Sequence, residues 1–172
     1  MTAAPKQPLW GVPADLEARR ARRGGAPVGQ IADLPPFEAG AVNCLRLWSD
    51  GPQGQVVVWN DFAGGLGATR ARKILEAFEQ LTDLCVTQGR RPLMRHSVGC
   101  ACLGADEACF ANLIATSVEG EREDTLLLAS LIVPPAMAPL LASLAAQFGL
   151  GLRRLCHKAV ADLTSAPAPT LH

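Results

Sequence analysis

The sequence predicts an all-α fold, a compact bundle of about five to seven helices with a loop that contains cysteine and histidine. Three observations support this class. Of the 172 residues, 49% are hydrophobic, which indicates a packed globular core. Aromatic residues make up only 5% and tyrosine is absent, so leucine and alanine, both strong helix formers, must dominate the core. Two segments also repeat apolar residues at i, i+4, i+7 and i+11, which is one face of a helix.

Residues 1–30 are predicted to be a flexible tail with a short basic helix and a Gly/Pro-rich linker. Pro13 and the acidic residues after it suit the first turn of that helix, and Gly24 follows its end. The helix carries a basic run: Arg19, Arg20, Arg22 and Arg23. A solvated helix face is favoured for this run over contact with phosphate or an anionic membrane.

Residues 31–162 are predicted to form a single helical domain. Its first helix starts near Asp33 and ends before Gly51, because apolar residues between these points repeat at helical spacing. Residues 56–59 are ambiguous, since β-branched valines favour a strand, but a short buried helix is the preferred interpretation. An α+β alternative with two short strands requires residues 54–60 and 150–156 to pair.

Residues 68–88 form the clearest predicted helix. Its apolar stripe is Ile74, Phe78, Leu81 and Cys85, and charged residues occupy the other faces. Gly89 and Pro92 are expected to end it. The glycines of residues 64–67 are predicted to form a turn before this helix, because the phosphate-loop pattern Gly-x-x-x-x-Gly-Lys-Ser/Thr is absent.

The C-terminal half is predicted to hold three or more further helices. Asp106 is expected to cap a helix that Gly120 interrupts, and residues 121–133 continue as a second helix up to a Pro-Pro pair. The second apolar stripe is Met137, Leu141, Leu144 and Phe148. It predicts a helix at the centre of the core that ends at Gly149. For residues 150–160 the sequence allows either a short helix or a strand. Residues 163–172 are predicted to be a disordered tail.

Residues 90–109 concentrate three of the six cysteines with a histidine, three arginines and two acidic residues. A candidate metal site consists of His96, Cys100, Cys102 and Cys109. Zinc prefers four thiolate or imidazole ligands, and a helix start at Cys109 is expected to lower its thiol pKa. The spacing departs from standard zinc motifs, because there is one Cys-x-Cys pair and no second pair.

Other roles remain open for the same residues. The cysteines can be small buried hydrophobes of a helical core, which is the preferred interpretation. A redox pair is expected between Cys102 and Cys109, and a cysteine nucleophile would need His96 or His157 as its base. For Arg90, Arg91 and Arg95, salt bridges with Asp106 and Glu107 are favoured over an anion site.

These observations narrow the classes of function. The chain has 16 basic and 16 acidic residues, so nucleic-acid binding is not expected. No apolar run reaches the roughly 18 residues of a membrane span, so no membrane association is expected and the location is predicted to be cytoplasmic, where thiols stay reduced. No catalytic set is complete, and no catalytic residue is assigned.

The sequence therefore predicts a non-enzymatic regulatory or protein-interaction domain. It is expected to bind a protein partner or to self-associate as a homo-oligomer. No cofactor is assigned with certainty, and a structural zinc ion in the 96–109 loop is the one considered. The alternative is a thiol-based redox or metal-dependent enzyme or sensor that uses Cys100, Cys102 and Cys109.

Overall fold

The computed structural model describes residues 23–165. Within this range six α-helices and one two-stranded sheet form the fold, which confirms the all-α prediction. The helices are α2 (Pro36–Ser49), α3 (Pro52–Leu66), α4 (Ala68–Thr87), α5 (Ala105–Glu119), α6 (Arg122–Ile132) and α7 (Ala138–Ser165). The strands are β1 (Pro27–Gln30) and β2 (Cys102–Gly104), and a 3-10 turn at Ile31–Asp33 follows β1.

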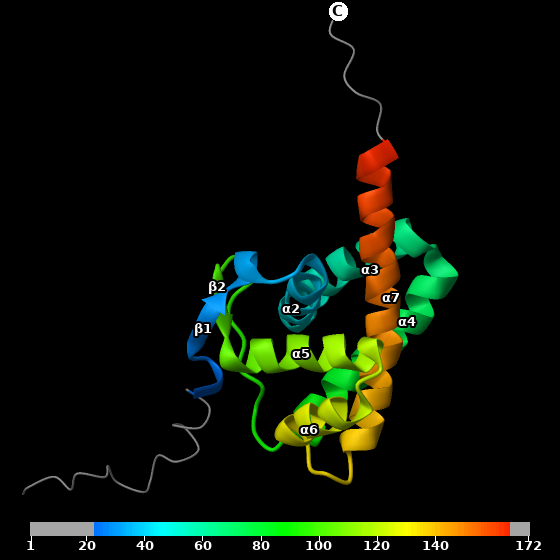
Figure 1. Ribbon diagram of the computed structural model, residues 1–172. Coiled ribbons are helices and arrows are strands. Elements are labelled where there is room, and N and C mark those ends of the chain that lie inside the picture. The colour runs from blue at the N-terminus through cyan, green and yellow to red at the C-terminus, as the bar shows by residue number, and fades with distance from the viewer. Residues whose placement is uncertain (1–22, 166–172) are drawn as a thin grey trace, which may run out of the picture.

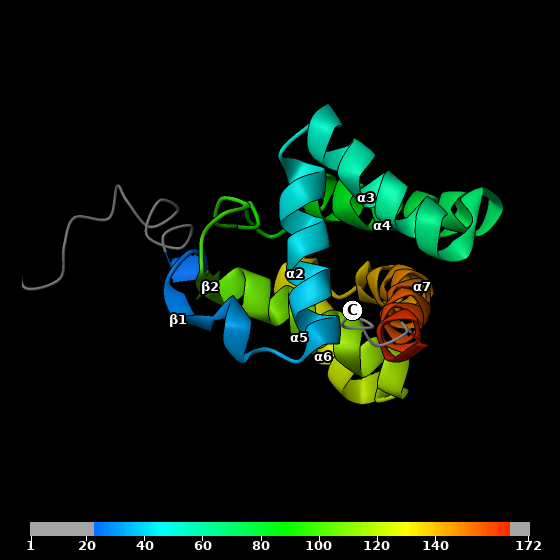
Figure 2. The same ribbon diagram turned by 90° about the horizontal axis from the view of Figure 1, so that it is seen from above.

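Helix α7 is the axis of the molecule. It has 28 residues and packs mainly against α4 and α5. Helices α3 and α4 lie on one side of α7, and α5 and α6 lie on the other (Figures 1 and 2). The two strands lie at the opposite end of the molecule from α7 (Figure 1). The C-terminal turns of α7, beyond Leu155, are mostly exposed and project past the other helices (Figure 1).

A cluster of aromatic rings holds four helices together. The ring of Phe78 on α4 stacks on Phe148 of α7, with 4.1 Å between the ring centroids. Phe62 of α3 stacks on the same Phe148 at 6.0 Å, and Trp48 of α2 meets Phe78 edge-on at 5.3 Å. Such pairs add to the stability that burial of apolar area already supplies. Four of the seven aromatic residues within 23–165 thus meet where α2, α3, α4 and α7 come together.

The α+β alternative places the strands wrongly. Residues 54–60 belong to α3 and residues 150–156 belong to α7, so neither segment is extended. The real strands pair antiparallel at the edge of the bundle, with Gln30 opposite Cys102. β1 lies inside the predicted tail of residues 1–30, so part of that tail belongs to the fold. The predicted short basic helix lies almost wholly outside the described residues, as do residues 166–172 of the predicted C-terminal tail.

Glycine positions misled the prediction of helix ends. Helix α3 runs through Gly64 and Gly65, and only Gly67, with a φ of 84°, makes the turn before α4. Helix α4 ends at Thr87, two residues before Gly89. Gly120, with a φ of 86°, does end α5 as expected, because a left-handed backbone suits glycine.

Helix α7 does not end at Gly149, and it reaches Ser165 beyond the predicted domain boundary. Its glycines serve close packing between helices. A Cβ atom at Gly149 would lie 2.5 Å from Cγ2 of Val118 on α5, and one at Gly151 would lie 2.6 Å from Cγ2 of Ile74 on α4. Glycine therefore lets α7 approach both neighbours, although it lowers helix propensity.

Replacing Leu141 with Ala is expected to lower the free energy of unfolding by about 2–5 kcal/mol, because the deletion leaves a cavity in a packed core. Leu141 is fully buried in α7, as predicted, and its neighbour Leu140 is 49% exposed. The matched variant Leu140→Ala is expected to cost less than about 1 kcal/mol. Urea denaturation of both variants measures the difference, and equal losses would contradict the position assigned to α7.

Candidate functional site

A buried ion pair lies where α2, the 88–101 loop and the first turn of α5 meet. Arg46 of α2 is 2% exposed and Glu107 of α5 is 0% exposed. The guanidinium and the carboxylate meet fork to fork, with Nε to Oε1 at 2.7 Å and Nη2 to Oε2 at 2.8 Å. Two parallel charge-assisted hydrogen bonds are the strongest form of this contact. The pair joins residues 61 positions apart in the chain.

Glu107 also receives hydrogen bonds from the loop and from its own helix start. The backbone N–H of Gly104 donates to Oε2 at 2.8 Å, as the glutamate of a capping box accepts it. The backbone N–H of His96 donates to Oε1 at 2.9 Å, and Nδ1 of His96 lies 3.0 Å from Oε2. Burial by itself would raise the pKa of Glu107, but the hydrogen bonds from Arg46, Gly104 and His96 lower it to about 2. Glu107 is therefore ionised and fully satisfied.

Arg46 uses its remaining donors on backbone carbonyls of the loop. Nη1 donates to the carbonyl of Cys100 at 2.6 Å and to that of Ser97 at 3.3 Å. Nη2 donates to the carbonyl of Cys102 at 2.6 Å. One side chain of α2 therefore fixes the path of residues 97–102, a segment with little regular structure of its own.

A second ion pair anchors the start of the loop. Arg91 contacts both carboxylate oxygens of Asp106 at 2.5 Å, and the backbone N–H of Met94 donates to Oδ2 at 2.8 Å. The predicted salt bridge between this arginine cluster and the acidic pair is thus present for Asp106. The partner of Glu107, however, is Arg46 and not one of the loop arginines.

The other two loop arginines bond to backbone carbonyls. Nε of Arg90 donates to the carbonyl of Ser130, and Nη2 of Arg95 donates to that of Ser49. The expectation that Asp106 caps α5 is wrong, because the cap is Gly104 and Asp106 lies in the first turn. Its side chain is turned to the loop instead.

The His96–Glu107 contact orients the loop. An ionised carboxylate only accepts hydrogen bonds, so Nδ1 of His96 carries the hydrogen in this contact. The carboxylate is shared with a guanidinium and two backbone N–H groups, so its charge is already compensated. Among residues 23–165 no serine or cysteine side chain is hydrogen-bonded to His96. The arrangement thus lacks the nucleophile that an acid–histidine pair activates in catalysis.

The structure does not gather the four predicted zinc ligands around one point. His96 is turned to Glu107, Cys100 and Cys102 are adjacent to each other, and Cys109 lies a turn into α5 near Cys85. Within the described range no group of three or more His, Cys, Asp or Glu side chains is placed to hold a metal ion. The zinc site therefore stays a prediction without geometric support here.

All six cysteines are free thiols, and burial raises the pKa of those in or near the core. Burial raises the pKa of Cys44 and of Cys85 to about 12 each, so both behave as core filler. The expected fall in the pKa of Cys109 at a helix start is wrong. Burial and then the charge of Asp106 raise that pKa, while Arg91 acts in the opposite direction.

A groove runs between the end of α2, α3 and α4. Its volume is about 430 Å³, and two tryptophans contribute to its apolar lining. The lining residues are Trp48, Pro52, Gln55, Val56, Trp59, Arg72, Leu75, Glu76 and Glu79. This groove was not predicted from the sequence, because a short buried helix was the preferred interpretation of residues 56–59, which include the groove residues Val56 and Trp59.

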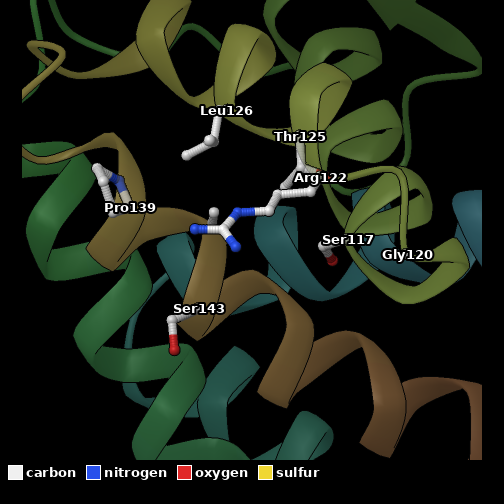
Figure 3. A pocket seen from close by; sticks show the side chains of 8 residues that line it. Ser117, Gly120, Arg122, Thr125, Leu126, Pro139 and Ser143 are labelled. Carbon is white, nitrogen blue, oxygen red and sulfur yellow. The ribbon is translucent and has the colours of Figure 1, made fainter.

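A smaller hollow of about 280 Å³ lies between the end of α5, α6 and the start of α7. The side chain of Arg122 extends across it toward Pro139 and Ser143, and it lies below Leu126 in the view of Figure 3. Arg122 is the one ionisable side chain among its lining residues. The hollow therefore has no acid–base pair with which to perform chemistry.

Comparisons with protein-family models, with curated proteins and with solved structures gave no match. Within residues 23–165, no helix has both the length and the apolar character that a membrane span needs. The function is therefore argued from the ion pair, the thiols and the groove.

Removing one partner of the buried pair is expected to cost about 3–5 kcal/mol of unfolding free energy, because the other charge is left buried and unpaired. This applies to Glu107→Leu and to Arg46→Met. The double variant Arg46→Met/Glu107→Leu is expected to lose less than the sum of the single losses, since no lone charge remains. Urea denaturation of the four proteins of this cycle measures the coupling, and additive losses would rule out the pair as a unit.

Acid is expected to weaken the protein through Glu107. The pKa of Glu107 falls from 4.5 to about 2 in the folded state, so its contribution to stability is complete above pH 4.5 and is lost as pH falls toward 2. The variant Glu107→Gln removes this titration. Its urea midpoint is expected to depend less on pH between about 5 and 2 than that of the parent protein. Parallel pH profiles of the two proteins would contradict the assignment.

Proposed function

We propose that this chain is a non-enzymatic protein-interaction domain that binds an amphipathic helix of another protein in the groove between α3 and α4. The observation that carries the proposal is the gathering of Trp48, Trp59 and exposed valine in that groove. Tryptophan is enriched among the residues that dominate binding energy at protein interfaces. A groove lined by apolar side chains between helices is a common receptor for a helix.

The outer face of α3 is unusual for a solvent-exposed helix. Val56 is 56% exposed and Val57 is 45% exposed, although valine is a modest helix former. Asp61 is the one charged residue among the fifteen of this helix. Large apolar side chains that gather on a surface generally mark a site of contact. The composition of α3 therefore supports an interface beside the groove.

The charges on the rim indicate the kind of partner. Glu76 and Glu79 of α4 line the groove together with Arg72, which leaves an excess of one negative charge. Neither glutamate forms a salt bridge within residues 23–165. A partner helix is therefore expected to offer apolar residues at i, i+3 or i+4 and i+7, with lysine or arginine along the edge that faces α4.

Selection from a library of helical peptides displayed on phage tests this proposal. The selected peptides are expected to be amphipathic with basic residues along one edge, because this pattern complements the groove. Val56→Glu is expected to weaken their binding at least about tenfold, since it places a charge in the apolar contact. Fluorescence anisotropy of a labelled selected peptide measures the affinity.

Val86→Glu is the matched control. Val86 is 83% exposed near the end of α4 and does not line the groove. Its replacement is expected to leave peptide affinity unchanged, and circular dichroism checks that both variants keep their helices. Equal binding to Val56→Glu and the parent protein would overturn the proposal. So would sedimentation showing that a second copy of the chain occupies the groove and Val56→Glu dissociates that dimer.

A further inference from the structure

We propose that Cys100 and Cys102 form a two-thiolate site for one Cu(I) ion, distinct from the groove and independent of the proposed interaction. Three observations lead to it: the backbone between the two cysteines is held extended, the two sulfurs are neighbours, and both side chains are partly exposed.

The hydrogen bonds of the loop set the direction of both side chains. The carbonyls of Cys100 and Cys102 each accept a hydrogen bond of 2.6 Å from Arg46. The carbonyl of Ala101 points the other way and accepts from the backbone N–H of Ile31 at 2.9 Å. Carbonyls that alternate in this way belong to extended backbone, where residues i and i+2 share one face. Both thiols therefore lie on the same side of the segment.

The two thiols lie close to each other on that side. The neighbouring Cys100 side chain is the main reason that the pKa of Cys102 is raised, and the nearby cation of Arg46 acts in the opposite direction. Both side chains are half-buried and open to solvent on one side. An ion that bridges the two sulfurs would therefore be reachable from solvent.

The geometry favours a bridging ion over a disulfide. An extended strand advances about 3.3 Å per residue, so the two Cα atoms lie about 6.6 Å apart, near the upper limit of about 6.8 Å for a disulfide. Shortening this Cα–Cα distance would break at least one of the two hydrogen bonds from Arg46 to the carbonyls of Cys100 and Cys102. Two metal–thiolate bonds of about 2.3 Å instead allow the sulfurs to lie up to about 4.6 Å apart. The fixed backbone of residues 100–102 therefore favours a metal ion between the two sulfurs over a disulfide.

The number and type of ligands select the ion. Zinc prefers four ligands, and the described residues offer no third or fourth side chain at this point. Soft thiolates select Cu(I), which accepts two ligands. Binding releases one proton from each thiol to solvent and transfers no electron, so the copper bis-thiolate carries one negative charge. The guanidinium of Arg46, which donates to the carbonyls of both cysteines, supplies a positive charge nearby.

Anaerobic titration of the full chain with Cu(I) tests the site. Bathocuproine disulfonate serves as the competing chelator, because its copper complex absorbs visible light. One Cu(I) per chain is expected to resist the competitor. Cys100→Ser and Cys102→Ser are each expected to weaken binding about 100-fold, since one thiolate alone holds the ion poorly. Cys156→Ser, which removes a half-buried thiol of α7, is the matched control and is expected to bind as the parent does.

Several outcomes would overturn this site. One is a finding that neither Cys100→Ser nor Cys102→Ser changes the affinity for Cu(I). Another is preferential binding of zinc that His96→Ala abolishes, because it would restore the four-ligand site. Phenylarsine oxide, which bridges neighbouring thiols, gives an independent readout. It is expected to protect Cys100 and Cys102, but not Cys156, from alkylation by iodoacetamide, and mass spectrometry of the peptides measures this. Absence of protection would also contradict the proposal.

Discussion

The salt bridge between Arg46 and Glu107 is the interaction on which the arrangement of the 88–104 region depends. Loops of this length without regular structure need other groups to satisfy their backbone. Here the two buried side chains do so, because Arg46 donates to three carbonyls of the loop and Glu107 accepts from two backbone N–H groups. Taking two charges out of water is costly, and such a pair is tolerated where every remaining donor and acceptor has a partner. Among residues 23–165 no buried side-chain nitrogen or oxygen lacks one.

Two different cores support the two proposed sites. The groove rests on the aromatic cluster of α2, α3, α4 and α7, in which Trp48 belongs both to the groove and to the stacked rings. The thiol pair rests on the polar ion pair of Arg46, whose position two residues before Trp48 places it on a different side of α2. A change in one core is therefore expected to leave the other site in place. Helix α2 is common to both, since it carries Trp48 and Arg46 two residues apart.

Periodicity predicted most helices because their stability comes from a repeating apolar face, which is a local property of the sequence. The pairing of Gln30 with Cys102 could not be predicted from the sequence, because such short strands form only when distant segments of the chain meet. Gly149 was misread for a related reason, because its role is set by Val118 on another helix. A signal for Arg46 did exist. It lies on the apolar face of its helix, four residues after the buried Val42, where a charge requires a partner.

The buried pair also explains why a polar centre is retained where an apolar one would serve stability equally well. Replacing a buried ion pair by apolar side chains of similar volume is often neutral or stabilising. An apolar pair at positions 46 and 107 would still fill the space between α2 and α5. It would offer no donor to the carbonyls of Cys100 and Cys102, so the loop would lose the constraint that sets both thiols on one face. The main role of the charge at Arg46 is therefore to fix the backbone conformation of the cysteine segment, and its contribution to stability is secondary. The groove needs no buried charge of this kind, because it rests on the aromatic rings of the bundle and its charged residues are not part of a buried ion pair.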